Sequence, residues 1–280
     1  MNKFFGAILL LVAQSALAVP AGVVETVQFP AFLDRNGLSV PLSAGIELQQ
    51  NDAVRTGDGG RLLIKLSEGS VLKLGQTAHF QFESVSVKKD GLFQAGLRVL
   101  QGAFRFTTSA LAKSRPRNVS IGIAKTLTIG IRGTDLWGRG REDKDLVCLI
   151  DGKIEVTGND SKTVTLDQPL QFFQSTRTAP PLPVAFLDKA QLDQWATETE
   201  LETGKGAATA KGAWRVVASG FASRDEAVGA NRALRANGYP AAIAALNTVQ
   251  ITGLAGEMEA ESLAHELQGK YGITEARAMK

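Results

Sequence analysis

The sequence contains few of the residues on which enzymes and metal sites most often depend. Its 280 residues include one cysteine, Cys148, and two histidines, His79 and His265. One cysteine cannot form an intramolecular disulfide, and its apolar neighbours in "LVCLI" predict a buried thiol. The three residues do not have the spacing of a zinc site, and neither histidine lies in a recognisable motif with a nucleophile. We therefore expect a protein that is not an enzyme and holds no metal or cofactor.

Long hydrophobic runs and a strong excess of one charge are also missing. After residue 18 no run approaches the ~20 apolar residues of a spanning helix, so no transmembrane segment is expected in the mature chain. The 31 basic and 28 acidic residues leave a formal net charge of +3. That excess is too small to predict nucleic-acid binding. The basic stretch "KSRPRN" (residues 113–118), with Arg139 and Arg141, could contact anionic cell-wall or lipid groups, but a solvated charge run is the commoner explanation.

The first 18 residues, "MNKFFGAILLLVAQSALA", have the pattern of a secretory signal peptide. Lys3 precedes an apolar run, and Ala16 and Ala18 form the small-residue pattern of a cleavage site. The run is too short to hold a stable membrane anchor. We expect export and cleavage after Ala18; the alternative is a short N-terminal anchor.

Residues 23–175 have the pattern of β-strands. The stretch "HFQFESVSV" alternates with period two, and turn dipeptides recur at Asp58-Gly59, Asp90-Gly91 and Asp151-Gly152. The last dipeptide lies between "VCLI" and "KIEV", which predicts a two-residue hairpin. Since no convincing helix interrupts this region, we expect an all-β domain, either a sandwich or a rolled, solenoid-like sheet.

Two connecting segments follow the predicted β domain. Three prolines, at positions 180, 181 and 183, end it, and residues 184–202 have the apolar spacing of a helix. We expect this helix to pack on the β domain through Trp195. Residues 203–213, "TGKGAATAKGA", contain no large apolar residue, which predicts a flexible linker.

Residues 214–280 contain an internal repeat. One copy begins at Val216 and the other at Val249, and each has the pattern of a strand, a turn and a helix with alanine and leucine on one side. Two such units predict a small α+β domain of the βαββαβ type, ferredoxin-like or RNP-like, with two helices on one face of a sheet.

The β region resembles a FecR domain over residues 53–157. The stretches "AVRTGDGGRLLIKLSEGSVLKL", "TLTIGIRGTDLW" and "VCLIDGKIEVTG" carry the resemblance. The family is named for an inner-membrane relay that reads an outer-membrane receptor and controls a sigma factor. Because the cytoplasmic segment and membrane span of such a relay are not found here, the resemblance implies an exported β domain rather than a complete relay.

The C-terminal repeat resembles a SPOR domain. Phe221 precedes Ala227 by six residues, and Leu254 precedes Ala260 by six, as in the two halves of that family. The resemblance implies binding to peptidoglycan, especially to glycan strands stripped of stem peptides. The sequence departs from the family at its glutamine and at its second-half arginine, which are Val217 and Gln250 here.

Strand alternation predicts which residues of this domain would bind a glycan. The side chains expected on the sheet face away from the helices are Arg215, Val217, Ser219, Gln250 and Thr252. A guanidinium, an amide and two hydroxyls can hydrogen-bond to sugar hydroxyls and N-acetyl groups. The alternative is a merely solvated sheet face. Trp214 and Tyr239 could add a stacking platform, although the parity of Trp214 favours the core.

The stretch "IRGTD" at the end of a predicted strand has two interpretations. Arg132 and Asp135 could be ligand groups in a cleft. Alternatively, Gly133 permits a sharp corner, Thr134 and Asp135 cap backbone donors, and Arg132 pairs with a local carboxylate. We favour the corner.

Together these patterns predict an exported two-domain binding protein of a Gram-negative periplasm. Its main partner would be the glycan strands of peptidoglycan, bound by the C-terminal domain. The alternative is a periplasmic sensing or scaffold protein whose domains bind other envelope proteins. A cell-wall hydrolase would require a cleft with a catalytic carboxylate or histidine, and no motif indicates one.

Overall fold

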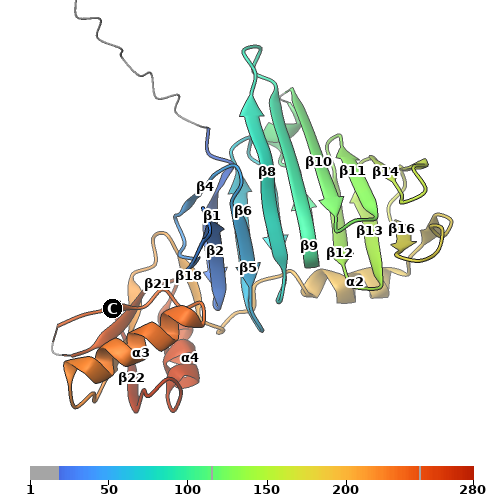
Figure 1. Cartoon of the computed structure of the whole chain (residues 1–280). Helices are drawn as coiled ribbons and strands as arrows, with labels where there is room; N and C mark the ends of the chain where they lie inside the picture. The colour runs from blue at the N-terminus through green and yellow to red at the C-terminus, as the bar shows by residue number, and fades with distance from the viewer. Residues whose placement is uncertain (1–18, 115, 246) are drawn as a thin grey trace, which may run out of the picture.

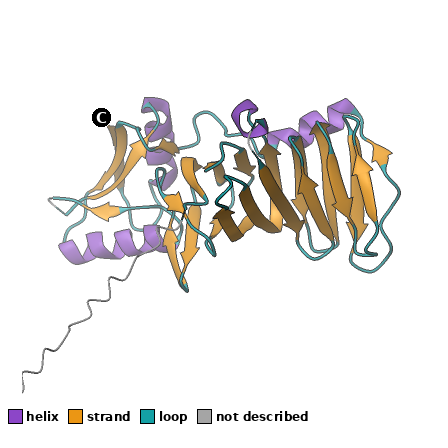
Figure 2. Ribbon diagram, turned by 90° about the horizontal axis from the view of Figure 1, so that it is seen from above, coloured by secondary structure: helices purple, strands orange, loops and turns teal. Residues whose placement is uncertain are grey.

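A computed structural model describes residues 19–114, 116–245 and 247–280 (Figure 1). The predicted signal peptide, residues 1–18, lies outside the described residues. The described chain forms a large β domain, followed by a smaller unit that contains the two longest helices (Figure 2). Within the described ranges, no helix is long and apolar enough to cross a membrane.

The β domain has two layers of strands, which we call layer A and layer B. Layer A contains β1 (Gly22–Gln28), β4 (Glu47–Leu48), β6 (Arg61–Leu66), β7 (Val71–Leu74), the end of β9 (Phe93–Thr107), β12 (Asp135–Gly140), β13 (Lys144–Asp151), β16 (Gln171–Thr176) and β17 (Ala185–Phe186). Layer B contains β2 (Ala31–Arg35), β3 (Leu38–Pro41), β5 (Ala53–Thr56), β8 (His79–Val87), the start of β9, β10 (Arg117–Ile123), β11 (Leu127–Ile131), β14 (Ile154–Thr157) and β15 (Thr163–Leu166). The all-β prediction for this region is confirmed.

Strand β9 belongs to both layers. Its first part pairs with β8 and β10 in layer B, and its last part pairs with β7 and β12 in layer A. The strand changes layer near Gly102, which has a φ of +90°. A Cβ atom at this position would lie 2.5 Å from the Ala78 Cα atom, so only glycine fits.

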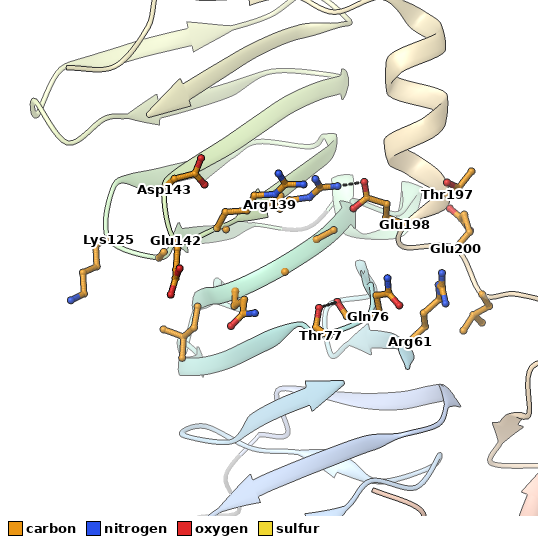
Figure 3. Close-up of a pocket in the computed structure, with 18 of the residues that line it drawn as sticks. Arg61, Gln76, Thr77, Lys125, Arg139, Glu142, Asp143, Thr197, Glu198 and Glu200 are labelled. Atoms are coloured by element: carbon orange, nitrogen blue, oxygen red, sulfur yellow. Dashed lines mark hydrogen bonds and ion pairs between the residues drawn. The ribbon is translucent and has the colours of Figure 1, made fainter. Parts of the chain in front are cut away.

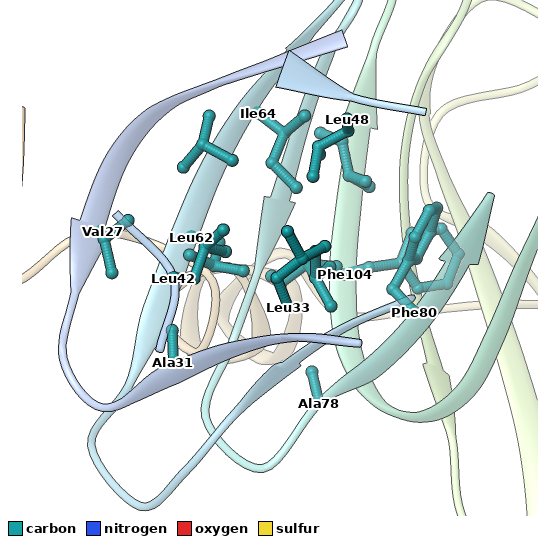
Figure 4. Packing of buried hydrophobic residues seen from close by; sticks show 14 of the residues in the cluster. Val27, Ala31, Leu33, Leu42, Leu48, Leu62, Ile64, Ala78, Phe80 and Phe104 are labelled. Atoms are coloured by element: carbon teal, nitrogen blue, oxygen red, sulfur yellow. The ribbon is translucent and has the colours of Figure 1, made fainter. Parts of the chain in front are cut away.

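The core lies between the layers and follows the predicted alternation. Phe80 and Phe82 of β8 and Phe104 and Phe106 of β9 are fully buried, and Figure 4 shows Phe80 and Phe104 among aliphatic side chains. Burial of each such side chain stabilises the fold by roughly 1.5–3 kcal/mol. Cys148 is also buried, as predicted, and burial raises the pKa of its thiol to about 12.

The predicted hairpin at Asp151-Gly152 is wrong. Strand β13 pairs with β12 and β16 in layer A, whereas β14 pairs with β11 and β15 in layer B. Because β13 already has a neighbour on each side, it has no free edge for β14. The dipeptide instead carries the chain from one layer to the other.

Helices occur at two places beside the β strands. Helix α1 (Ala110–Lys113), which the sequence did not predict, is a single turn. Helix α2 (Lys189–Thr197) is shorter than the predicted helix over 184–202, because β17 occupies part of that range and Asp188 caps the first turn. Trp195 of α2 stacks on Trp137 of β12, with ring centroids 4.9 Å apart. The predicted packing of this helix on the β domain is confirmed.

The segment 203–213, expected to be a flexible linker, is built into the fold. Its strand β18 (Ala207–Thr209) pairs with β1 and touches β21 of the C-terminal unit. Ala207 and Ala208 are buried, since their small side chains fit between the two units. A segment rich in small residues can be either a solvated linker or a tightly packed connection, and composition does not separate the two.

The C-terminal unit contains β19 (Trp214–Ser219), α3 (Arg224–Ala236), β20 (Ala242–Ile243), β21 (Val249–Leu254), α4 (Glu257–Leu267) and β22 (Glu275–Met279). Its antiparallel strands lie in the order β22, β19, β21, β20. Helix α4 contacts β19, β21 and β22, and α3 contacts β20 and β21. Buried alanines and leucines, among them Ala227, Leu234 and Leu263, fill the space between helices and sheet.

The C-terminal unit also packs directly on the β domain. The backbone N–H of Ala31 donates to the carbonyl of Gly238 at 3.2 Å, and the rings of Phe29 and Tyr239 lie 6.0 Å apart. A Cβ atom on Gly238, whose φ is +83°, would lie 2.8 Å from the Phe32 ring. Glycine is therefore required at this contact.

Candidate functional site

The strand register brings the five predicted glycan-binding residues together on one sheet face. Arg215 of β19 lies opposite Thr252 of β21, and Val217 lies opposite Gln250. Ser219 follows two residues later on the same side of β19. The residues between them, Val216, Ala218, Val249 and Ile251, are buried beneath the helices. Alternation therefore predicted the arrangement of this face.

The face includes a third strand that the sequence analysis missed. On β22, Arg277 lies opposite Val217, and Glu275 lies opposite Ser219, whose hydroxyl donates to the Glu275 carboxylate at 3.3 Å. The Arg277 side chain is 77% exposed, so its guanidinium adds donors to the same face. The stretch "EARAM", residues 275–279, alternates between small and charged residues and could have indicated this strand. It lies outside the two repeated strands from which the face was predicted.

The proposed aromatic platform is wrong. Tyr239 is only 3% exposed, and its hydroxyl donates to Glu266 Oε1 at 2.7 Å. Burial raises the pKa of Tyr239 further above its usual value. Trp214 is half-buried and packs against the core, as its parity indicated. The buried ring of Tyr239 offers no free face for stacking on a sugar.

The "IRGTD" stretch forms the favoured corner, but its side chains pair differently. The chain passes from β11 in layer B to β12 in layer A, and Gly133 has a φ of +86°. The Asp135 carboxylate accepts bonds from Arg105 Nε and Nη2, at 3.0 and 2.7 Å, and from the hydroxyl of Thr107. The bond to Asp135 raises the pKa of Arg105. Arg132 is exposed and makes no ion pair among the described residues, and the buried hydroxyl of Thr134 has no hydrogen-bond partner. The predicted pairing by Arg132 and the predicted backbone caps by Thr134 and Asp135 are therefore wrong.

The predicted solvated basic run is only partly correct. Arg117 is partly buried and donates to the Thr108 hydroxyl at 3.0 Å, and burial lowers its pKa. Arg139 is also largely buried, whereas Arg141 is exposed. Residue 115 lies outside the described residues.

A large hollow lies on the outer face of layer A. It has a volume of about 1100 Å³ and lies between that face and residues 197–202, at and after the end of α2 (Figure 3). Three glutamates of this segment point to cations of the sheet. Glu198 pairs with Arg139, Glu200 with Lys73 and Arg105, and Glu202 with Arg61. We call residues 198–202 the acidic strap. This segment forms one wall of the cleft, and its ion pairs hold it against the sheet.

A buried aspartate fixes the opposite rim of this cleft. Asp145 is fully buried and accepts bonds from the Thr126 hydroxyl at 2.5 Å and from Arg177 Nη1 at 2.8 Å. Arg177 Nη2 also donates to the backbone carbonyl of Arg141 at 2.7 Å. These bonds fix the turn over residues 141–144, which was not predicted because its partners lie far apart in the sequence.

Comparisons with known proteins found one matching family and similar solved structures. Two crystal structures of a candidate anti-sigma factor from Parabacteroides distasonis ATCC 8503, at 1.65 and 2.50 Å resolution, are 12% identical over 51% of this chain, each with a TM-score of 0.42. The aligned region covers 64% and 63% of those chains, so this chain spans less than two thirds of their length. No curated protein matches the chain. Residues 52–155 match the family described as FecR protein, which confirms the predicted FecR domain in this part of the chain.

Proposed function

We propose that this protein is an exported, non-enzymatic scaffold of a Gram-negative periplasm. Its C-terminal unit, which resembles a SPOR domain, binds peptidoglycan glycan strands, and its FecR domain presents a second surface to other envelope components. The observation that carries the proposal is the open sheet face on which Arg215, Gln250 and Thr252 lie side by side. The signal-peptide pattern supports export and a periplasmic location.

The chemistry of this face suits a neutral, hydroxyl-rich ligand. Arg215 offers guanidinium donors, Gln250 offers both a donor and an acceptor, and Thr252 offers an exposed hydroxyl. Val217 lies between Gln250 and Arg277 and supplies an apolar patch against which a sugar ring can lie. A glycan strand running across β22, β19 and β21 would meet all of these groups.

The segment that connects the two units is packed into the fold, and this affects what glycan binding would do. Because β18 pairs with β1 and contacts β21, the two units do not behave as independent modules on a flexible tether. Binding of the C-terminal unit to a glycan would therefore fix the orientation of the FecR domain relative to the wall. This geometry supports a scaffold better than it supports an increase in avidity through a linker.

Binding to another envelope protein is the second candidate. Among the described strands, β22 pairs only with β19, so its other edge is free to accept an extended peptide by β-strand addition. A protein partner would use this edge, whereas a glycan would use the sheet face. Variants of the face therefore separate the two candidates.

Co-sedimentation with peptidoglycan sacculi tests the proposal. Protein without residues 1–18 should sediment with sacculi, and more should sediment after an amidase removes the stem peptides. The double variant Arg215→Ala, Gln250→Ala should lose this binding, whereas Arg232→Ala, on the exposed side of α3, should keep it. If the wild type and the control both stay in the supernatant, before and after amidase treatment, glycan binding is contradicted.

Zymography tests the absence of enzyme activity. The protein is expected to leave peptidoglycan intact in the gel. A clearing zone at its position would overturn the proposal of a binding protein.

A further inference from the structure

A small hollow on the outer face of layer A has no role in glycan binding by the C-terminal unit. Its volume is about 160 Å³, and it is lined by Arg139, Arg141, Lys144, Leu146, Gln174 and Trp195. Arg139 and Arg141 also line the larger cleft, so the two spaces are neighbours.

The fold holds the lining residues in place from several directions. Arg139 of β12 lies opposite Leu146 of β13, and Leu146 lies opposite Gln174 of β16. Their side chains therefore form a row across the sheet. Trp195 forms a wall because it stacks on Trp137, which is fully buried.

The charged rim of the hollow is fixed as well. The backbone N–H of Arg141 donates to the carbonyl of Lys144 at 3.0 Å, which closes the turn over residues 141–144. Arg177 and the buried Asp145 hold this turn through the bonds described above. The turn therefore places the side chains of Arg141 and Lys144 beside Arg139.

The hollow has an excess of positive charge. Three of its six lining residues are cations, and none of the others is acidic. Arg139 pairs with Glu198 and lies over the Trp137 ring, whereas Arg141 and Lys144 have no side-chain partner among the described residues. Burial, with a contribution from nearby Arg141, lowers the pKa of Arg139 to about 10. An anion in the hollow would reduce the repulsion between these cations.

The larger cleft limits where an anion can bind. Its lining includes Glu142 and Asp143 at the turn and the three glutamates of the acidic strap. The lining also includes five cations, Arg61, Lys125, Arg139, Arg141 and Arg177, so the cleft has no excess of positive charge. The uncharged part of a ligand would therefore occupy the cleft, and its anionic group would occupy the small hollow, where cations are in excess.

We propose that this hollow binds the phosphate group of a small polar molecule such as a sugar phosphate. Two guanidinium groups and an ammonium can neutralise a phosphate dianion and hydrogen-bond to its three free oxygens, whereas a carboxylate needs only one guanidinium. Trp195 offers apolar surface to the body of the ligand, and the Gln174 amide can bond to a hydroxyl. This inference does not depend on glycan binding by the C-terminal unit.

Isothermal titration calorimetry on the protein without residues 1–18 tests the inference. The ligands are glucose 6-phosphate, glucose, glucuronate and inorganic phosphate, each at low ionic strength. Glucose 6-phosphate should bind saturably, and the double variant Arg141→Ala, Lys144→Ala should weaken this binding at least about tenfold. The matched control Lys88→Ala, Lys89→Ala removes two cations from the exposed β8–β9 turn and should bind like the wild type.

Each of the other ligands gives a result that could overturn the inference. No saturable binding of glucose 6-phosphate, or equal binding of glucose, would exclude a phosphate site. Tighter binding of glucuronate than of glucose 6-phosphate would mean that the hollow prefers a carboxylate to a phosphate. Equal affinities for inorganic phosphate and glucose 6-phosphate would assign the hollow to free phosphate and exclude the contact with Trp195. If circular dichroism shows that the double variant is unfolded, Lys144→Gln alone should still weaken binding.

Discussion

Glu259 of helix α4 holds Ala207 of the connecting segment, since its Oε2 atom accepts the Ala207 backbone N–H at 2.9 Å. The same carboxylate accepts the N–H groups of Gly204 and Lys205, at 2.7 and 2.9 Å. Glu259 is only 9% exposed. One buried carboxylate thus satisfies three backbone donors of a segment that the sequence predicts to be flexible, and it fixes the junction between the two units.

Replacing Glu259 with alanine should weaken this junction. The change leaves three N–H groups without their charged acceptor, so the free energy of unfolding should fall by about 2–4 kcal/mol in urea titrations. Hydrogen exchange at Gly204, Lys205 and Ala207 should accelerate. The matched control is Glu261→Ala, an exposed position on the same helix, which should change stability by less than ~0.5 kcal/mol. Equal exchange rates in wild type and Glu259→Ala would show that the carboxylate does not hold the segment.

The buried Asp145 should be more sensitive to substitution than its exposed neighbour Asp143. Asp145→Ala leaves Arg177 without its carboxylate partner, and we expect a loss of about 3–5 kcal/mol in the free energy of unfolding. Asp143→Ala, on the same turn, should cost less than ~0.5 kcal/mol. Chemical denaturation of both variants checks this difference. Similar losses at the two positions would contradict the role of Asp145 in fixing the turn over residues 141–144.

Local patterns predicted those parts of the fold that depend on neighbours in sequence. The alternation in residues 79–87 predicted a strand with one buried side, and Phe80 and Phe82 lie on that side, because side chains of a strand alternate between its two faces. The same rule identified the sheet face that carries Arg215 and Gln250. It could not identify the partners of β13 and β14, because a dipeptide such as Asp151-Gly152 suits a hairpin and a crossing between layers equally well.

The ion pairs could not be predicted because they join distant segments. Arg105 lies 30 residues from Asp135 and 95 residues from Glu200, yet it contacts both. An alternating row of glutamates in the acidic strap indicates an extended segment with one charged side, but nothing in the strap identifies Arg61 or Arg139 as its partners. The packing of α2 through Trp195 and the pairing of β18 with β1 bring the two ends of the strap to the sheet.

Trp195→Ala should therefore loosen both α2 and the acidic strap. Loss of the stack on Trp137 should lower the free energy of unfolding by about 2–3 kcal/mol, less than for a fully buried tryptophan because Trp195 is partly exposed. Hydrogen exchange in residues 190–200 should accelerate. Trp195→Phe keeps an aromatic ring on Trp137 and should lose less than half as much stability. Equal losses in the two variants would mean that ring stacking is not what holds the helix.

The ion pair of Asp34 and Arg55 should make part of the stability depend on pH. Arg55 Nε lies 2.6 Å from Asp34 Oδ2, and this bond lowers the pKa of Asp34 below its usual 3.8, although burial opposes the shift. The carboxyl binds its proton less readily in the folded state than in the unfolded state. The stability that the ion pair adds is therefore present above pH 3.8 and is lost as the pH falls through the lower folded pKa. His79, opposite Arg55 in β8, adds positive charge nearby when it is protonated, which favours the same carboxylate.

Asp34→Asn should remove this dependence. At about pH 7 the variant should be less stable than the wild type by ~1 kcal/mol or less, because both partners of the pair are partly exposed. Since the wild-type carboxyl becomes protonated in acid, the difference should shrink as the pH falls through the folded pKa, and urea titrations at a series of pH values measure it. Asp58→Asn, at an exposed turn without an ion pair among the described residues, should show no such change. A difference between wild type and Asp34→Asn that stays constant down to about pH 2 would mean that Arg55 does not stabilise the ionised carboxylate.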